Sequence, residues 1–153
     1  MFPFDERAGI YNINCLSMAG GSTLKATPVT AQVVVNVTGT SCEGDVISIT
    51  DNSVINNTSG IAGNLIFNYA GTGTMKLAGG STSYFVVNAP NSAVTIHGGS
   101  DLYGAVVANS IDDIGGVNLH FDNALTVSTS PATITYSSVT SSYQTLAFRS
   151  LPY

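Results

Sequence analysis

The fold of this chain is decided between residues 85 and 121, which read FVVNAPNSAVTIHGGSDLYGAVVANSIDDIGGVNLHF. A short pattern occurs nearly twice in this stretch. Each copy is an apolar run, a polar corner and a second run that ends in histidine, at His97 in the first copy and His120 in the second. Short apolar runs bounded by Gly, Pro and Asn are typical of β-strands. A repeat of about 20 residues indicates a solenoid, in which each repeat packs on its neighbours.

Glycines extend this period to the rest of the chain. The corners that they mark are Gly20 and Gly21, Gly39, Gly60, Gly79 and Gly80, Gly98 and Gly99, and Gly115 and Gly116. The spacing between successive corners is nearly constant. Glycine is favoured where the backbone takes a positive φ or approaches another strand closely. We therefore expect an all-β chain, a single-stranded β-helix (β-solenoid) of about six coils of roughly 19 residues.

Asparagines give a second marker. Asn68, Asn88 and Asn109 each end an apolar run, and stacked amides can form a hydrogen-bonded ladder along the coils. Asn36 also ends such a run, but its distance from Asn68 in the sequence is no multiple of the glycine period. We therefore expect an irregular coil or an excursion within residues 40–63.

The two ends of the chain differ from the repeat. Residues 1–8 have no periodic pattern and are interpreted as a leader or an expression remnant, so the single domain is expected to span residues 9–153. After Phe121 the repeat stops, and residues 126–148 contain three candidate strands rich in Ser and Thr. A final coil leaves strand edges unpaired, so we expect these strands to form a C-terminal cap.

Composition narrows the class of protein. Only 8% of the residues are charged, against about 25% in a typical soluble domain. A net charge of −5 with four scattered basic residues argues against nucleic-acid binding, which needs clustered Lys and Arg. No apolar stretch is long enough for a membrane span, and Asp5, Glu6 and Arg7 stand where the apolar segment of a signal peptide would begin. This profile is typical of secreted and cell-surface β proteins, and we expect that location.

Cys15 and Cys42 are the two cysteines of the chain. Their spacing in the sequence matches no metal-site motif. In an oxidising compartment they could form a disulfide, and otherwise they would act as small buried apolar residues. The sequence leaves both alternatives open.

Candidate chemistry is sparse. Asp112 and Asp113 could serve acid–base catalysis or bind a cation, but neighbours on a strand point to opposite faces. His97 and His120 occupy matching points of the two copies, so they could lie on one face, yet two histidines without a third ligand make a weak metal site. We therefore expect no catalytic residues, metal or cofactor.

The chain resembles the glycine-rich β-helical domain of bacterial PilX-type pilus-assembly proteins and related surface proteins. The residues that carry the resemblance are 88–94, Gly98 and Gly99, 102–107 and 120–122, with weaker matches at residues 9–13 and 33–39. The resemblance implies a β-helix at the bacterial surface, and it brings no catalytic residues with it.

These observations favour a non-enzymatic structural or adhesive module of a bacterial cell-surface or pilus-associated protein. Its expected partners are other surface or pilus subunits or further copies of itself, with glycan as another candidate. The first alternative is a carbohydrate-active β-helix enzyme or a polysaccharide-binding module, which an acidic cluster in one groove would favour. The second alternative is a self-assembling filament subunit.

Overall fold

A computed structural model describes residues 4–27, 32–78, 82–99 and 101–126. Within these ranges the chain is all-β, as predicted, and its helical segments are the short 3-10 turns η1 (Ala62–Asn64) and η2 (Asn123–Thr126). Neither of these described turns is long and apolar enough to cross a membrane. Apart from Thr126, the expected C-terminal cap lies outside the described residues.

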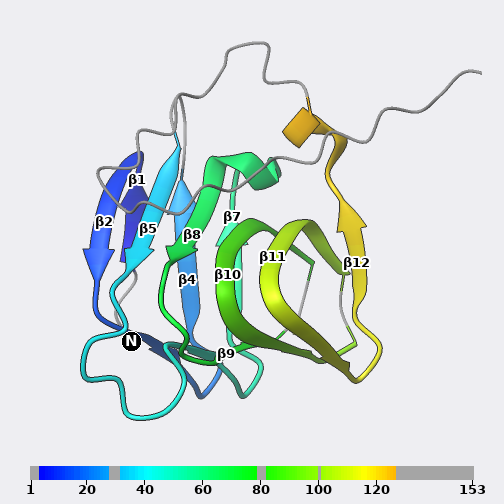
Figure 1. The fold of residues 1–153 in the computed structure, drawn as a ribbon. Helices are drawn as coiled ribbons and strands as arrows, with labels where there is room; N and C mark the ends of the chain where they lie inside the picture. Colours follow the sequence, from blue (N-terminus) through cyan, green and yellow to red (C-terminus); the bar gives the residue numbers. More distant parts are fainter. Residues whose placement is uncertain (1–3, 28–31, 79–81, 100, 127–153) are drawn as a thin grey trace, which may run out of the picture.

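The larger sheet is parallel and curled, and six strands lie side by side in its first layer (Figure 1). In spatial order they are β2 (Gly9–Ile13), β5 (Val33–Val37), β8 (Leu65–Tyr69), β10 (Ser83–His97), β11 (Asp101–Ile114) and β12 (Asn118–Phe121). Each successive pair is parallel, so the chain must return to the same end of the sheet before every new strand. Chain order and spatial order therefore coincide in this layer.

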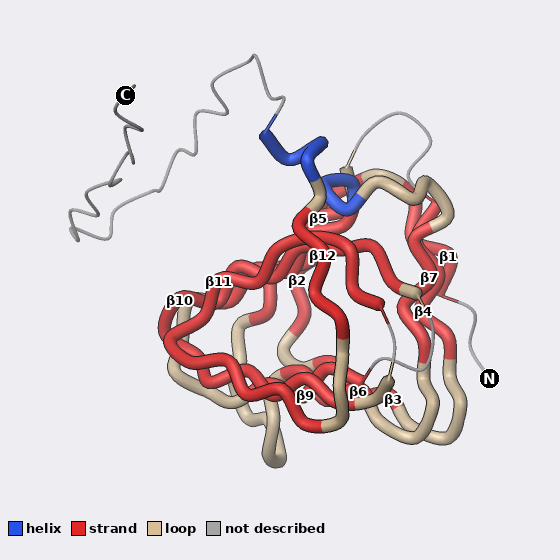
Figure 2. Tube along the Cα trace, turned by 90° about the vertical axis from the view of Figure 1, so that its right-hand side faces the viewer, coloured by secondary structure: helices blue, strands red, loops and turns tan. Residues whose placement is uncertain are grey.

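A second layer faces the first. In spatial order it contains β3 (Leu16–Met18), β6 (Ile47–Ile49) and β9 (Met75–Ala78). The second half of β10 is the next strand and pairs with β9. The long strands β10 and β11 belong to both layers, and their register shifts between Ala89 and Ala93, around Pro90. Proline has no N–H to give to a sheet, which suits it to such a bend. Figure 2 shows the two layers joined through this bend.

A separate three-stranded sheet lies beside the first passes of the chain. It contains β1 (Phe4–Arg7), β4 (Thr23–Thr27) and β7 (Val54–Asn57), all parallel. Figure 2 shows it on the side opposite the bend of β10 and β11. Since β1 pairs with β4 from Phe4 onward, strand pairing begins before the expected domain boundary at residue 9. Phe4–Arg7 therefore form a strand within the stretch interpreted as a leader or an expression remnant, and that interpretation stays a prediction.

The core lies between the two layers and is built from alternate residues of the strands. In β5 the buried residues Val33, Val35 and Val37 alternate with half-buried ones, as the pleat of a strand requires. Near the centre, the rings of Phe67 and Phe85 meet edge to face with centroids 5.7 Å apart. Such pairs add about 0.5–1.5 kcal/mol to the free energy gained by burying the rings.

The length of each pass around the sheet varies. Register partners in the first layer are far apart in the sequence early in the chain, as with Val35 and Phe67. They are closer together later, as with Val87 and Val106. The first two passes are long because they include β4 and β7, and the second also carries a loop between β5 and β6, whereas later passes return directly from the second layer to the first. The repeat period expected from the glycines therefore describes only the later passes.

The glycine corners consequently do not form one stacked column. Those that follow second-layer strands are Gly20 and Gly21 after β3, Gly98 and Gly99 after β10, and Gly115 and Gly116 after β11. Gly39 follows β5 and Gly60 follows β7, so they lie at other corners, and Gly79 and Gly80 lie outside the described residues. After β6 the corresponding turn is made by Asp51 and Asn52, whose φ values are 55° and 58°. Short polar side chains tolerate this left-handed conformation better than others do.

Candidate functional site

A column of aromatic rings stands on the outer face of β10, β11 and β12. Tyr84 is in register with Tyr103, and Tyr103 with His120. The rings are stacked, with centroids 5.0 Å apart for the tyrosine pair and 4.5 Å for Tyr103 and His120, at interplanar angles of 17° and 13°. Since Phe85 and Leu102 point into the core, the strand pleat turns the adjacent tyrosines outward. The column is half-buried because each ring covers its neighbour.

Asp101 connects the aromatic column to β12. One of its carboxylate oxygens lies 3.0 Å from Nε2 of His120 and accepts a hydrogen bond from the Asn118 amide at 3.1 Å. Hydrogen bonding by His120, and then by Asn118, lowers the pKa of the Asp101 carboxyl below its ordinary value of 3.8. Side chains of His120 and Asp101 remain 43% and 40% exposed. Both interactions join β11 to β12, so the carboxylate fastens neighbouring strands.

A ladder of amides runs along the same outer face. Asn36 donates to Asn12 at 3.0 Å, Asn68 donates to Asn36 at 3.1 Å, and Asn88 donates to Asn68 at 3.4 Å. The predicted members Asn68 and Asn88 are confirmed, and Asn36, which did not fit the sequence period, belongs to the ladder. The prediction was wrong for Asn109, because the residue of β11 in register with Asn88 is Val107.

His97 and His120 do not share a face. His97 lies on the second layer, in register with Ala78 and Ile114, whereas His120 lies on the first layer beside Tyr103. The Nε2 atom of His97 is buried and has no hydrogen-bond partner among the described residues. The matching sequence positions of the two histidines are therefore not matching positions in the sheet.

Asp112 and Asp113 are also separated by the pleat. Asp112 is in register with the outward-facing Thr95 and Asp113 with the core residue Ile96, so their carboxylates leave opposite sides of β11. Asp113 accepts a hydrogen bond from the backbone N–H of Val117 at 3.3 Å. The pair therefore does not present two carboxylates to one ligand.

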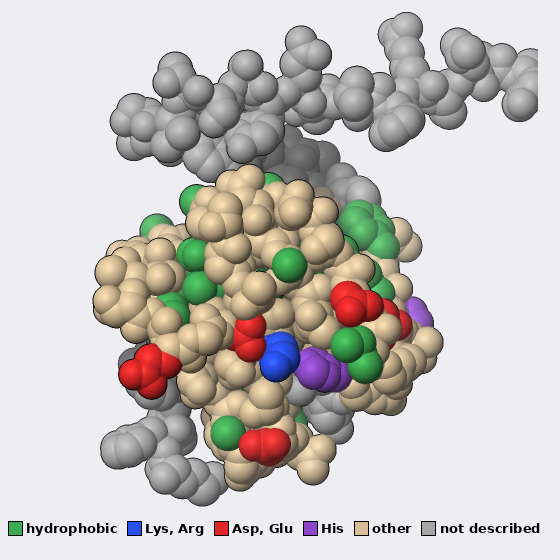
Figure 3. Space-filling view, turned by 60° about the horizontal axis from the view of Figure 1, so that its bottom comes forward, with side chains coloured by type: hydrophobic (Ala, Val, Ile, Leu, Met, Phe, Trp, Pro, Cys, Tyr) green, Lys and Arg blue, Asp and Glu red, His purple; other side chains and the backbone are tan. Residues whose placement is uncertain are grey.

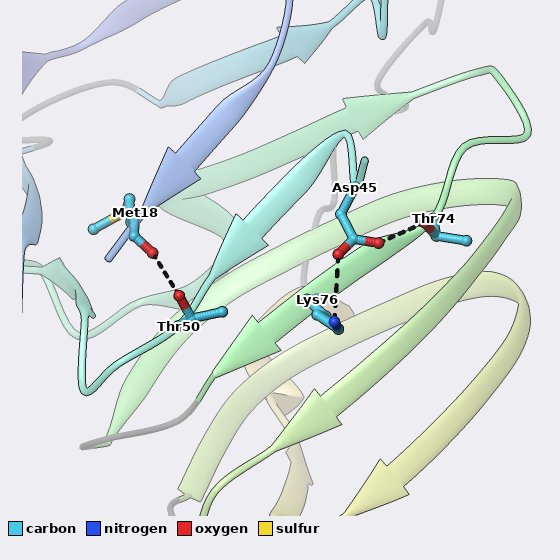
Figure 4. Close-up of polar contacts among 5 residues, drawn as sticks. All are labelled: Met18, Asp45, Thr50, Thr74 and Lys76. Atoms are coloured by element: carbon cyan, nitrogen blue, oxygen red, sulfur yellow. Dashed lines mark hydrogen bonds and ion pairs between the residues drawn. The ribbon is translucent and has the colours of Figure 1, made fainter. Parts of the chain in front are cut away.

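The outer face of the second layer is polar. Asp45 accepts a hydrogen bond from the Thr74 hydroxyl at 2.5 Å and lies 3.8 Å from the ammonium group of Lys76 (Figure 4). The backbone carbonyl oxygen of Met18 accepts a hydrogen bond from the Thr50 hydroxyl at 3.3 Å on the same layer (Figure 4). Figure 3 shows few charged side chains on this side, and most of the surface in view is formed by uncharged side chains and backbone. Within the described ranges, no group of three or more His, Cys, Asp or Glu side chains is arranged to hold a metal ion.

Cys15 and Cys42 form a disulfide. The structure thus takes the first of the two alternatives that the sequence left open. The bond joins the turn after β2 to the loop between β5 and β6, which is the part of the second pass that exceeds the regular repeat.

Sequence reasoning missed the role of Tyr69. Its side chain is 7% exposed and lies against the backbone of three glycines, Gly39, Gly71 and Gly73. A methyl group at Gly39 would come within 2.6 Å of the Tyr69 ring, and one at Gly71 would meet the hydroxyl group. The backbone N–H of Gly73 donates to that hydroxyl at 3.1 Å. The signal in the sequence was the pair of glycines directly after an aromatic strand end.

Asn57 was also missed. It is 5% exposed, and its side chain is hydrogen-bonded through both its nitrogen and its oxygen. Its amide nitrogen donates to the carbonyl oxygens of Ile61 and Tyr84, both at 2.9 Å, and its oxygen accepts from the backbone and hydroxyl groups of Ser59. Asn57 thereby ties the end of the small sheet to β10.

Residues 15–127 match the sequence profile of a domain family of unknown function, DUF7305. No curated protein matches the chain, and no solved structure does.

Proposed function

The chain belongs to DUF7305, and we propose that it acts there as a non-enzymatic structural or adhesive module, a short β-solenoid of about six coils on the bacterial surface. The observation that carries this proposal is the use made of the polar side chains. The amide ladder, the aromatic column and the Asp101 contacts all join one strand to the next. The polar and aromatic side chains that could serve catalysis or binding are therefore used to hold the sheet together.

The arrangement of the carboxylates supports the same conclusion. Most glycoside hydrolases use two carboxylates that face one substrate. Asp112 and Asp113 leave opposite sides of β11, and Asp101 is engaged by His120 and Asn118. We therefore favour the structural module over the carbohydrate-active enzyme as the function of this chain.

The disulfide supports a location outside the cytoplasm. Disulfides persist in oxidising compartments, and the low charge of the chain is typical of secreted β proteins. The resemblance to PilX-type surface proteins agrees with that location, and surface or pilus subunits remain the proposed partners.

Location is tested in the producing bacterium with an epitope-tagged chain. A protease added to intact cells should remove the tag from a surface-displayed module, while a cytoplasmic marker protein stays intact. Protection of the tag in intact cells, with cleavage only after lysis, would contradict the surface role.

The enzymatic alternative is tested with purified chain and a panel of bacterial and plant polysaccharides. We expect no release of reducing ends above the background of the Asp101→Asn and Asp112→Asn variants. Release that disappears in either variant would establish the enzyme instead. Retention on one polysaccharide without release would establish the binding module.

A further inference from the structure

The last strand, β12, leaves core-type side chains uncovered. Leu119 is in register with Leu102, but Leu102 is 4% exposed and Leu119 is 47% exposed. Phe121, which continues the inward row of Phe85 and Gly104, is 58% exposed. Residues that point into the core on β10 and β11 are therefore continued on β12 by apolar side chains that are exposed.

The second layer ends in the same way. Ile111 of β11 is in register with Val94, and their exposed fractions are 47% and 1%. Ile111, Leu119 and Phe121 together define what we term the terminal apolar edge. Apolar side chains are stabilised by burial, so an edge that leaves these three about half exposed favours a covering element.

The backbone of β12 is open on the same side. The N–H of Asp122 donates to the carbonyl oxygen of Gly104 on β11 at 3.3 Å. Because successive N–H groups of a strand point in opposite directions, those of Leu119 and Phe121 point away from β11. Among the described residues no strand lies on that side. An unpaired parallel edge with an apolar row is a template for one more strand.

We propose that residues 127–153 of the same chain cover the terminal apolar edge, with a strand that pairs with β12 in parallel. The inference rests on the strand geometry and not on the surface role proposed above, so either can fail alone. The segment follows directly on η2, where the N–H of Leu125 donates to Asp122 at 2.9 Å. It is longer than the last pass, which runs from Gly104 to its register partner Phe121, so it is long enough for one more pass.

The composition of the segment fits this edge. Residues 127–148 carry no charge, and Ala132, Ile134 and Tyr136 alternate with threonines, as a strand with one buried face requires. The edge itself is acidic, since Asp101, Asp112, Asp113 and Asp122 lie on or directly beside the last two strands. A second copy with a net charge of −5 would be repelled there, whereas the tethered uncharged segment is not. Tethering also gives the segment an effective concentration in the millimolar range.

The test measures hydrogen exchange of single backbone amides by NMR in the full chain. The amides of Leu119 and Phe121 should exchange at least about tenfold more slowly than unfolded-chain rates, at every protein concentration. The double variant Ile134→Asp with Leu146→Asp places charge on the apolar side of the segment and should raise both exchange rates by about tenfold or more. The control, Thr133→Asp with Thr145→Asp, adds the same charge on the opposite side and should leave them within about twofold.

Slow exchange of the Val35 and Phe67 amides in all variants verifies that the core is intact. Unprotected Leu119 and Phe121 amides in the unmodified chain would overturn the proposal, because the edge would then be open. Protection that grows with protein concentration and ignores the Asp substitutions would assign the edge to a second copy and would overturn it as well.

Discussion

The side-chain amide of Asn68 donates a hydrogen bond to that of Asn36 across 3.1 Å, although the two residues are far apart in the sequence. Asn68 also accepts a hydrogen bond from Asn88. It therefore occupies the centre of a ladder that begins at Asn12 and joins the first four passes of the chain. Because the ladder lies on the outer face, it specifies strand register without placing polar groups in the core.

Asn68→Ala should destabilise the chain. The substitution removes two hydrogen bonds and leaves one amide on each neighbouring strand without its partner, at a cost of about 1–2 kcal/mol. Denaturant unfolding followed by circular dichroism measures the effect. Asn109→Ala is the matched control, because Asn109 is exposed and outside the ladder, and its effect should stay within about 0.5 kcal/mol. Equal effects of the two substitutions would mean that the ladder adds nothing.

Gly71→Ala should cost more. Its methyl group would collide with the hydroxyl of Tyr69, which is fixed by Gly73 and enclosed by Gly39. Overpacking of this kind typically costs about 1–3 kcal/mol. Gly99→Ala is the control, because nothing lies within 4 Å of the added methyl group. A melting temperature of Gly71→Ala that equals that of Gly99→Ala would show that the Tyr69 loop yields without cost.

The carboxyl of Asp101 should titrate below its ordinary pKa of 3.8, because His120 and Asn118 hydrogen-bond to the charged form. A lowered pKa in the folded state means that the contribution of Asp101 to stability is present above pH 3.8 and is lost as the pH falls through the folded value. NMR of the side-chain carboxyl carbon measures the midpoint. His120→Ala should move the midpoint up toward 3.8, and His97→Ala, on the other layer, should not. A midpoint that is unchanged in His120→Ala would contradict the assigned cause.

The sequence predicted the class of the fold because the signals involved are local. A short apolar run such as Val33–Val37 indicates a strand by its own composition, so it can be recognised without its neighbours. The order of strands followed as well, since a parallel repeat stacks in chain order. Asn68 and Asn88 were found because the pass between them has nearly the regular length.

The register of the early passes could not be predicted, because it depends on loop lengths that carry no periodic signal. The disulfide-linked loop and β7 lengthen the second pass, and this displaced Asn36 from the expected count. The prediction that Asn109 belongs to the ladder was wrong, because the register of β10 and β11 places Val107 beside Asn88. His120 was singled out, but its partners were not, because Tyr84, Tyr103 and Asp101 are joined to it only by the register of β10, β11 and β12.

Removal of the disulfide by Cys15→Ser with Cys42→Ser should lower the free energy of unfolding. Closing the loop between the two cysteines contributes about 3–4 kcal/mol in the chain-entropy model. Chemical denaturation of the oxidised chain and the double variant measures the difference, and intact mass before and after reduction verifies the bond. Two thiols that alkylate freely in folded, exported protein would contradict the bond itself.

Association should occur at the N-terminal edge, where β2 has a neighbour only on the β5 side among the described strands. Ile10 of this strand is 70% exposed, and the few charges nearby give little protection against pairing with another strand. Asn12 in this strand and Asn14 just after it are exposed and accept hydrogen bonds from Asn36 and Thr38. Lys at both positions would charge the edge without entering the core, so Asn12→Lys with Asn14→Lys should weaken self-association by about tenfold or more in sedimentation.

Asn12→Gln with Asn14→Gln is the neutral control, and Asn56→Lys with Asn109→Lys carries the same charge at exposed positions away from β2. Both controls should associate as the unmodified chain does, and unfolding of every variant verifies the fold. A chain that stays monomeric at high concentration would exclude the filament subunit and leave the module to act as a single displayed copy. Equal loss of association in all three variants would contradict the β2 edge as the specific contact.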